Sequence, residues 1–358
     1  MSRIFVGIPA YNEEDISLTL KTLFGKAHSP ADVYVGLALH YPAKNYPDVS
    51  MFPNVSITLI DEPIGLGTCP TRALAAEHYN GEEYYLQIDG HTIFKNKWDV
   101  ILKANYKDIQ KKVEKPIITG YVPDWHRDTK TSQPLTCEGS TDFEKYLPPY
   151  SLVDKNHPTK WVKNIDPEKF KYFAYGCEGV NSPAHLTVDF TKQYYVEHHL
   201  SSGHFLFTSG DFLREVPLDP LITYHEENTT PLRAWTRGYR MFAIKDHVLW
   251  TREMMVNGRD VPNSWRATAG VVNNNEPSLQ DKIAAGCLRN KDILTGKILG
   301  EWGAPSKELL EAYEAASGIN YKEFYEEMYK EVENNRDKYY AAQTLYDLEK
   351  LRDQQSAN

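Results

Sequence analysis

Long apolar runs are missing from this 358-residue chain. No stretch approaches the roughly 18 consecutive apolar residues that a membrane-spanning helix requires, and residues 1–9 show neither a charged start nor a cleavage signal. Cysteine is also scarce, since Cys69, Cys137, Cys177 and Cys287 lie far apart and form no CxxC pair. A disulfide scaffold and a cysteine-rich zinc site are therefore excluded, and we expect a chain without a membrane anchor in a reducing cytoplasm.

A large excess of either charge is missing as well. The net charge is -9, and residues 305–358 hold seven Lys and Arg against twelve Asp and Glu, so the rest of the chain is nearly balanced. A balanced body excludes a strongly basic nucleic-acid-binding domain, although a local basic face stays open. There is no internal repeat and no low-complexity block. With 41% hydrophobic and 25% charged residues, the composition is typical of a globular protein.

Strand-like runs alternate with helical patterns over the first 120 residues. Strands are predicted at 3–8, 32–39, 55–60, 83–88 and 116–120, and helices at 13–24, 71–79 and 98–113. This alternation indicates β-α units in a mostly parallel sheet that helices cover.

The second half of the chain is patterned differently. Residues 121–171 are polar and rich in proline, which is typical of a lid or an acceptor-binding insertion. Strand-like runs return between 172 and 245, with a helix near 232–238. Beyond residue 304, apolar residues at helical intervals predict two amphipathic helices.

The tripeptide Asp89-Gly90-His91 follows an apolar strand directly. Ligands of parallel sheets bind where strands end in loops, and a carboxylate and an imidazole two residues apart can face one cation. Diphosphates are commonly held by a divalent ion, and the imidazole favours Mn²⁺ over Mg²⁺. The alternative is a turn in which Asp89 caps the next helix and His91 packs.

Two further loops carry polar groups. In the segment PAYNEE, at residues 9–14, a Pro-bearing turn ends the first strand, Asn12 or Glu13 opens a helix, and Tyr11 offers a stacking face for a base; an ordinary helix cap is the alternative. At residues 65–72, a GLG loop precedes a helix whose Arg72 can grip a diphosphate. Neither GxGxxG nor GK[ST] is complete, which argues against a dinucleotide enzyme or an NTPase.

Together these motifs resemble the GT-A glycosyltransferases: an IPAYNEE start, a GxG loop with an arginine five residues on, and DGH where a DxD triplet is usual. The chain is more closely similar to the N-acetylglucosaminyltransferase-type family that includes cytoplasmic hydroxyproline-modifying enzymes, and to related viral DNA-base glycosyltransferases. The segments that carry this similarity lie within residues 3–250 and read YYLQIDGHTIFKNKWD, ITGYVPDW, SSGHFLFTSGDFLREVPLDP and YHEENTTPLRAWTRGYRMF. The resemblance implies an α/β, GT-A mixed sheet with a C-terminal helical extension.

The resemblance also implies roles for single residues. A UDP-sugar donor would be bound by Pro9, Tyr11, Asn12, Gly67, Arg72 and Asp89. Asp89 and His91 would hold Mn²⁺ or Mg²⁺, with His91 in place of the usual second carboxylate. A third ligand is expected from a later strand, where His247 is the nearest candidate and the position of Thr251 is the alternative.

Glu226 and Glu227 stand where GT-A enzymes place an acidic residue near the acceptor and the reacting sugar. We expect these adjacent carboxylates to point in different directions, one toward the acceptor hydroxyl or the sugar and the other toward the helix start or Arg233. A solvated turn is the alternative. The closer family implies retention of the anomeric configuration, so that neither glutamate is required to act as a conventional base.

The acceptor is left open by the sequence. The aromatic residues Trp125, His126, Trp161 and Trp235 predict either a groove for the acceptor or ordinary core packing. Two basic stretches keep a DNA acceptor open, although solvated helix faces are their usual explanation. They comprise Lys103, Lys107, Lys111 and Lys115, and then Arg233, Arg237, Arg240, Arg252, Arg259 and Arg266.

The sequence thus predicts a metal-dependent hexosyl-, N-acetylhexosaminyl- or pentosyltransferase that acts on a hydroxymethylated DNA base or a protein hydroxyl. The alternatives are a non-catalytic nucleotide-sugar-binding module and a nucleotidylyltransferase, although the latter would need a basic loop where PAYNEE is acidic. We expect a transferase domain at 1–304, with a nucleotide-sugar half at 1–125 and an acceptor half at 126–304. A helical extension at 305–358 would form homo-oligomer contacts. The expected location is the cytoplasm, of the host if the protein is viral.

Overall fold

The structure is a computed structural model. It describes residues 2–41, 46–60, 66–120, 194–223, 226–252, 279–317 and 334–337, together with residue 122 and short strands at 124–127, 134–136, 152–153, 161–162, 174–177, 180–183, 255–256 and 259–260.

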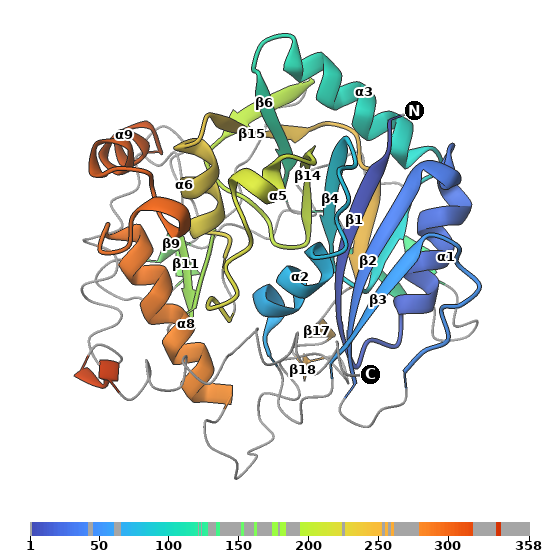
Figure 1. Cartoon of the computed structure of the whole chain (residues 1–358), viewed down its shortest axis with the longest axis horizontal. Helices are drawn as coiled ribbons and strands as arrows, with labels where there is room; N and C mark the ends of the chain where they lie inside the picture. The colour runs from blue at the N-terminus through green and yellow to red at the C-terminus, as the bar shows by residue number, and fades with distance from the viewer. Residues whose placement is uncertain are drawn as a thin grey trace.

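An eight-stranded mixed sheet forms the centre of the molecule, in the order β13-β15-β6-β14-β4-β1-β2-β3 (Figure 1). Its first half is parallel, since β1 pairs with β2 and β4, and β2 pairs with β3. In its second half β14 runs antiparallel to β4 and β6, while β6 and β15 are parallel. The strands are β1 Ile4–Tyr11, β2 Val33–His40, β3 Val55–Ile60, β4 Tyr84–Ile88, β6 Lys115–Thr119, β13 Tyr195–His198, β14 Phe205–Ser209 and β15 Tyr239–Ile244.

A smaller four-stranded sheet has the order β5-β16-β7-β8. Its strands are β5 Thr92–Phe94, β16 Leu249–Arg252, β7 Asp124–Arg127 and β8 Pro134–Thr136. Because β5 follows β4 closely in the chain, residues 89–91 form the turn that joins the two sheets. Three short pairs complete the described strands: β9 Leu152–Val153 with β10 Trp161–Val162, β11 Ala174–Cys177 with β12 Val180–Pro183, and β17 Met255–Val256 with β18 Arg259–Asp260.

Helices cover both faces of the large sheet. Alternation along β1 directs Ile4, Val6 and Ile8 into one buried cluster and Phe5 into another. The first cluster is closed by α1 Ile16–Lys26 and α3 Trp98–Gln110, and the second by α5 Phe212–Glu215 and α6 Thr229–Trp235. On the same face as the second cluster, α2 Thr68–Ala76 packs against β2 and β3. None of the described helices is both long and apolar enough to cross a membrane.

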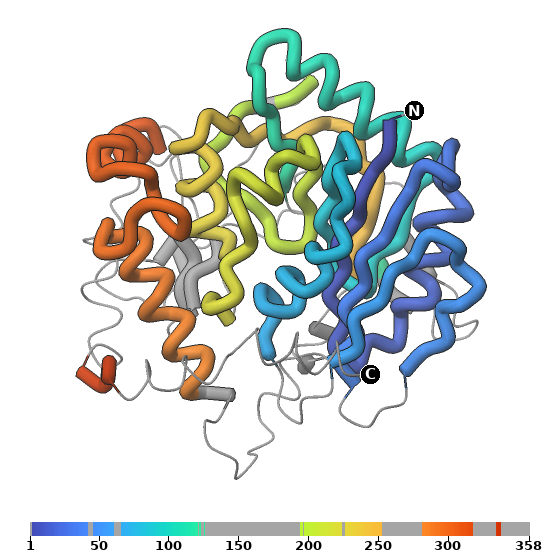
Figure 2. The backbone as a smooth tube through the Cα atoms, in the orientation of Figure 1, coloured from blue at the N-terminus to red at the C-terminus, as the bar shows by residue number. Residues whose placement is uncertain are grey.

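The C-terminal helices pack on α6. They are α8 Leu279–Leu294 and α9 Lys307–Ser317, and the 3-10 turn η2 Gly300–Trp302 lies between them. A second 3-10 turn, η1 Pro30–Asp32, precedes β2. Leu294, Leu310 and Tyr313 form a buried cluster with Leu232 of α6. Figure 2 shows this orange-to-red segment lying beside the yellow segment that contains α6.

The alternation of strands and helices predicted for the first 120 residues is confirmed, with two differences at the end of β1. This strand continues through Pro9 to Tyr11 instead of ending at residue 8, because beyond Gly7 it pairs with β2 alone, and a proline is tolerated where one side needs no donor. Helix α1 begins at Ile16, after Asp15, rather than at Asn12 or Glu13. The second helix predicted for the C-terminal region lies largely outside the described residues.

Candidate active site

The polar groups of the candidate site meet at the carboxyl end of β4. Phe205 of β14 lies opposite Ile88 of β4, so the turn before β14 faces the turn that begins at Asp89. Gln87 Nε2 donates a hydrogen bond of 2.7 Å to Gly203 O and ties these two turns together. The site therefore lies at the sheet edge where ligands of α/β proteins bind.

Arg72 lies between two carboxylates at this edge. Its Nη2 donates to Asp89 Oδ1 at 2.6 Å, and its Nη1 contacts Glu226 Oε1. Only 5% of the Arg72 side chain is exposed. Burial alone would raise the pKa of Asp89, but the charges of Arg72 and His91 lower it. The guanidinium that we expected to grip a diphosphate is thus engaged by the protein's own carboxylates.

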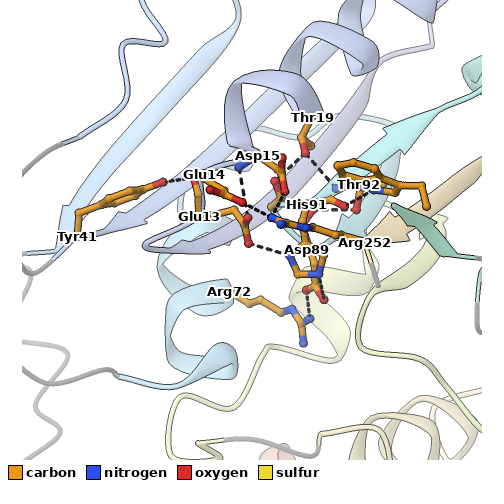
Figure 3. Close-up of polar contacts among 12 residues, drawn as sticks. Glu13, Glu14, Asp15, Thr19, Tyr41, Arg72, Asp89, His91, Thr92 and Arg252 are labelled. Carbon is orange, nitrogen blue, oxygen red and sulfur yellow. Dashed lines mark hydrogen bonds and ion pairs between the residues drawn. The ribbon is translucent and has the colours of Figure 1, made fainter. Parts of the chain in front are cut away.

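His91 is held by a second carboxylate. Its Nδ1 lies 2.8 Å from Glu13 Oε2, and its Nε2 lies 3.8 Å from Asp89 Oδ2 (Figure 3). Burial opposes a charge on this imidazole, yet the negative charge and hydrogen bond of Glu13 raise the pKa of His91 to about 9. The surroundings of His91 therefore favour positive charge.

The backbone of His91 is fixed as well. Its carbonyl oxygen accepts hydrogen bonds from Trp125 Nε1 at 2.9 Å and from the Arg252 amide at 3.0 Å. The Arg252 side chain contacts Glu14 Oε1 at 2.6 Å and Asp15 Oδ2 at 2.5 Å. Glu13 therefore binds the His91 ring, whereas Glu14 and Asp15 hold the Arg252 side chain. Helix α1 has no side-chain cap hydrogen bond, which corrects the interpretation of the motif as an ordinary cap.

The adjacent carboxylates of Glu226 and Glu227 point toward the same place. A Cβ atom built on Gly203 would lie 2.8 Å from Glu227 Oε1 and 3.0 Å from both Glu226 Oε1 and Arg72 Nη1. The expectation that the two side chains diverge is wrong, because the missing side chain at Gly203 leaves room for both. Arg233 binds neither and donates to Pro217 O at 2.6 Å and Glu301 O at 3.2 Å.

The two glutamates differ in their partners. Glu226 Oε2 accepts a contact of 2.9 Å from Cys69 Sγ, in addition to the contact of Oε1 with Arg72. Glu227 Oε2 is buried and has no hydrogen-bond partner among the described residues. Burial raises the pKa of Glu227. A buried oxygen without a hydrogen-bond partner destabilises the folded state unless a ligand or water binds it.

The residues expected to bind the donor lie at the same edge. Tyr11 ends β1, with its ring edge-on to His40 at a centroid distance of 5.0 Å, and the Asn12 amide donates to His40 O at 3.0 Å. The chain turns sharply at Asn12, where φ is 46°. Pro9 O lies 3.2 Å from the position of a Cβ built on Gly90, and Gly67 precedes α2 with a φ of 97°. The structure thus brings Pro9, Tyr11 and Asn12 to the edge that carries Asp89.

His247 is not brought to this edge. Lys95 donates from its amide to Val248 O at 2.8 Å, and the charge of Lys95 together with burial lowers the pKa of His247. Thr251, the alternative position, pairs with Thr92, next to His91. His247 precedes β16, at the end of this strand that lies away from the Asp89 turn, whereas Thr251 lies within the strand near that turn.

His204 is a site residue that sequence reasoning missed. It precedes Phe205, which faces Ile88, and the charges of Asp89, Arg72 and His91 all act on its ring. Burial lowers the pKa of His204 to about 4, so the ring is neutral at neutral pH. The segment around His204 is among those that carry the family similarity, but nothing in it singled out this histidine, because only the antiparallel pairing of β14 with β4 places it beside Asp89.

Asp89 and His91 fit a cation that takes its remaining ligands from a bound substrate and from water. No group of three or more His, Cys, Asp or Glu side chains within the described ranges is arranged to hold a metal. Asp89 Oδ2 and His91 Nε2, however, are separated by 3.8 Å, which allows one cation about 2 Å from each to contact both. Two protein ligands suit an ion whose other ligands are phosphate oxygens and water.

Most of the basic and aromatic residues considered for an acceptor are engaged within the protein. Trp125 is fully buried, and Arg240 stacks over Trp235 at 4.4 Å. Lys115 Nζ contacts Glu215 at 2.6 Å, and Lys103 Nζ donates to Ser2 O at 2.8 Å. Arg266 and the side chains of His126, Trp161 and Arg259 lie outside the described residues. These contacts remove much of the reason for expecting a basic acceptor surface.

Comparison with known proteins agrees with this architecture. The family model described as "Glycosyltransferase (GlcNAc)" matches residues 49–285. A structure of GalNAc-T7 with UDP, GalNAc and Mn²⁺ superimposes with a TM-score of 0.50 and 12% identity, covering 93% of this chain and 58% of that one. The chain therefore spans less than two thirds of the length of that neighbour.

A more distant structure is that of S. aureus TarS with UDP-GlcNAc, at a TM-score of 0.40 and 12% identity, covering 81% of this chain and 72% of that one. No curated protein matches the sequence. At these identities the structural likeness concerns the fold, which is the GT-A fold of glycosyltransferases. Because the family model covers well over half of the sequence, the chain belongs to the GlcNAc glycosyltransferase family.

Proposed function

We propose that the chain transfers a sugar from a UDP-sugar to a hydroxyl acceptor and that Asp89 and His91 hold the Mn²⁺ or Mg²⁺ ion required. The observation that supports this most directly is the convergence of Asp89 Oδ2 and His91 Nε2, 3.8 Å apart, at the carboxyl end of β4. The GalNAc-T7 neighbour was solved with UDP, GalNAc and Mn²⁺, which is consistent with the proposal.

The charges of the site explain why a cation is needed. The carboxylates of Asp89 and Glu226 contact the Arg72 guanidinium, the charge of Glu227 acts on it, and Glu13 contacts the neighbouring His91. A diphosphate is an anion and would be repelled by these groups unless positive charge lay between them. When bound, a divalent ion supplies that charge and offsets the negative charge that develops on the departing diphosphate.

The nucleotide side of the site is assigned to the end of β1. Tyr11 offers an aromatic face for the base, and Pro9 and Asn12 line the same edge. Gly67 and Arg72 border it from α2. In this arrangement Arg72 acts on the donor through Asp89, whose carboxylate it orients.

The acidic pair divides into two roles. Glu226 holds Arg72 and accepts from Cys69, so it positions the guanidinium. Glu227 has a buried oxygen without a partner among the described residues and is assigned the contact with the reacting sugar or the acceptor hydroxyl. If transfer retains the anomeric configuration, as the family resemblance implies, Glu227 orients these groups and need not remove a proton.

A protein hydroxyl suits the described surroundings better than a DNA base. The described side chains of the site are predominantly acidic. Arg233 and Arg237 already donate hydrogen bonds to backbone carbonyl oxygens within residues 300–303. A polyanionic acceptor would be repelled by these carboxylates and would meet few free cationic groups among the described residues. The acceptor that we propose is therefore a hydroxyl-bearing peptide segment.

The donor half of the proposal is tested by UDP-sugar hydrolysis. UDP release from a panel of UDP-sugars should depend on added Mn²⁺ or Mg²⁺ and should fall roughly 100-fold in Asp89→Asn. Asp108→Asn is the matched control, since Asp108 is exposed on α3 and pairs with the exposed Lys111 that follows this helix. Equal rates in Asp89→Asn and in the wild type would contradict the proposal.

The acceptor is tested separately. Hydroxyproline- and serine-bearing peptides and hydroxymethylated duplex DNA should be offered side by side with the preferred UDP-sugar. We expect incorporation into peptide, and incorporation into DNA alone would overturn the choice of acceptor without affecting the donor assignment.

A further inference from the structure

The side chain of Glu13 crosses from one turn of the site to another. Glu13 lies between β1 and α1, and its Oε2 reaches His91 Nδ1 at 2.8 Å on the turn after β4. The two residues are far apart in sequence, so the contact exists only because β1 and β4 are neighbours in the sheet. Figure 3 shows the carboxylate directed at the ring, with Asp89 near the opposite nitrogen.

The backbone around Glu13 is built to hold this direction. Asn12 adopts a φ of 46°, which L-residues rarely adopt, and its amide donates to His40 O. Tyr41 Oη donates to Glu13 O at 2.5 Å. These contacts fix the main chain on both sides of the Glu13 Cα atom, so the carboxylate has a defined starting point.

Gly90 completes the fit. A Cβ atom at Gly90 would lie 3.0 Å from Glu13 Cγ, which is closer than side chains normally approach. The glycine in Asp89-Gly90-His91 therefore leaves the space through which the Glu13 side chain passes. The need for a small residue at Gly90 therefore comes from this contact. It does not come from the backbone conformation, because Gly90 does not have a positive φ.

The contact determines the state of the imidazole. A carboxylate accepts hydrogen bonds and does not donate them, so Nδ1 of His91 carries the proton in this pair. The other nitrogen, Nε2, faces Asp89 Oδ2. A hydrogen-bonded carboxylate behind a histidine ligand commonly fixes the orientation of the ring toward a metal.

We propose that Glu13 is a positioning residue for His91: its carboxylate holds the Nδ1 proton and turns Nε2 toward the cation shared with Asp89. This inference rests on the proposed function, because it concerns the same cation. It assigns Glu13 neither to a helix cap nor to the nucleotide pocket. Loss of its carboxylate should weaken cation binding without removing either ligand.

The affinity for Mn²⁺ in the presence of UDP is the direct test, measured by calorimetry at fixed pH. Glu13→Ala should weaken Mn²⁺ binding about 10- to 100-fold. Glu14→Ala is the matched control: Glu14 is the next residue, its side chain is 47% exposed, and it contacts Arg252 rather than the His91 ring. It should bind Mn²⁺ like the wild type, and equal binding by Glu13→Ala would overturn the inference.

Two further variants separate the hydrogen bond from the charge. Glu13→Gln keeps an oxygen that can accept a hydrogen bond from His91 Nδ1. Glu13→Asp keeps the negative charge, but its side chain is one methylene too short to reach this nitrogen. We expect the Gln variant to bind Mn²⁺ more tightly than the Asp variant. The opposite order would show that Glu13 acts through its charge alone and would refute a positioning role.

Pulsed EPR of bound Mn²⁺ gives a readout that general destabilisation does not change. Nitrogen modulation from the His91 imidazole should be present in the wild type and in Glu14→Ala, and should be lost or reduced in Glu13→Ala. Thermal unfolding without metal confirms that each variant is folded. If the wild type itself binds no Mn²⁺ with UDP, the proposed function fails and this inference with it; a signal unchanged in Glu13→Ala defeats the inference alone.

Discussion

Arg72, Glu226 and Glu227 lie close together near Gly203 but differ in how their charges are compensated. The guanidinium is almost fully buried, and its charge is compensated by Asp89 and Glu226. Removing one partner of a buried ion pair leaves an uncompensated charge, which costs more than the pair contributes. Glu227 has no such partner among the described residues for its Oε2. The two adjacent carboxylates should therefore respond differently to the same substitution.

Glu226→Gln should lower the free energy of unfolding by about 3 kcal/mol, because it removes one of the carboxylates that compensate the buried charge of Arg72. Glu227→Gln should leave stability within about 1 kcal/mol or raise it, since it neutralises a buried group whose pKa is already raised by burial. Sugar transfer should fall at least roughly 100-fold in Glu227→Gln. Urea unfolding and initial transfer rates measure the two effects, and a stability loss confined to Glu227→Gln would reverse the assignment.

The buried side chain of His198 should make the free energy of unfolding depend on pH. Its Nε2 lies 3.2 Å from Thr119 O, and burial lowers its pKa from 6.5 to about 4. The folded state thus binds this proton less readily than the unfolded state, so the stabilisation is complete above pH 6.5 and is lost as pH falls toward 4. The loss should be roughly 3 kcal/mol.

The measurement is chemical unfolding of the wild type and of His198→Asn at a series of pH values. The variant should lose less stability than the wild type on acidification. Part of the dependence should remain, because burial lowers the pKa of His204 in the same direction. Parallel curves for the two proteins would contradict the role given to His198.

At the residue scale, the sequence proposed Asp89 and His91 because they follow a predicted strand, and it proposed the acidic pair because the family resemblance implied it. It did not single out His204 or the contact of Glu13 with His91. Their importance depends on which strands are neighbours, β14 beside β4 and β1 beside β4, and strand order is not written in local spacing.

Among the elements, the start of α2 links the C-terminal helices to the site. Gly67 has a φ of 97°, and a Cβ atom there would collide with Thr223 O. Thr223 is in turn fixed by α8, since its Oγ1 donates to Lys282 O at 2.7 Å and its amide would lie 2.8 Å from a Cβ on Gly286. The position of Arg72 on α2 therefore depends on packing against a segment that lies far away in sequence.

Gly67→Ala should destabilise the protein by about 1–3 kcal/mol, because both the backbone conformation and the nearby carbonyl oppose a side chain. Gly25→Ala is the control: Gly25 lies in α1, and nothing is within 4 Å of a Cβ built there. That variant should be neutral or about 0.5–1 kcal/mol more stable. Thermal or urea unfolding decides, and equal effects at the two positions would contradict the strain argued for Gly67.

Element types were predicted more reliably than element ends. The runs at 55–60 and 83–88 became β3 and β4 almost without change. All residues of β4 are buried, whereas Ile57 and Leu59 of β3, which is an edge strand, are exposed. The predicted end of β1 and start of α1 were wrong. Glu13 contacts His91 in the turn after β4, Glu14 and Asp15 contact Arg252 of β16, and α1 has no side-chain cap hydrogen bond.

For the whole molecule, the described C-terminal helices are part of the packed body rather than a loose addition. Tyr313 of α9 is fully buried, packs edge-on against Trp235 at 5.7 Å, and donates from Oη to His199 O at 2.7 Å. Arg237 holds the connecting segment by donating to Gly300 O at 2.6 Å and Gly303 O at 2.9 Å. The domain boundary expected at residue 305 and homo-oligomer contacts through this region stay predictions.

Tyr313→Ala should lower the free energy of unfolding by about 3–5 kcal/mol through loss of the buried ring. Tyr313→Phe keeps the ring and loses the hydrogen bond to His199 O, and should cost about 1 kcal/mol. Both variants should unfold in a single transition if α9 belongs to the same cooperative unit as α6. A separate early transition would show that the C-terminal helices unfold independently.

The sequence by itself determined the alternation of strands and helices, the family resemblance, and the presence of a carboxylate and an imidazole after the fourth predicted strand, because these depend on local periodicity and spacing. Only the tertiary structure decided that Arg72 is held between Asp89 and Glu226, that Glu226 and Glu227 converge at Gly203, that His247 lies away from the site, and that Glu13 reaches His91. The physical reason is that each of these contacts joins segments brought together by the order of strands in the sheet and by packing of distant helices, which no local pattern encodes.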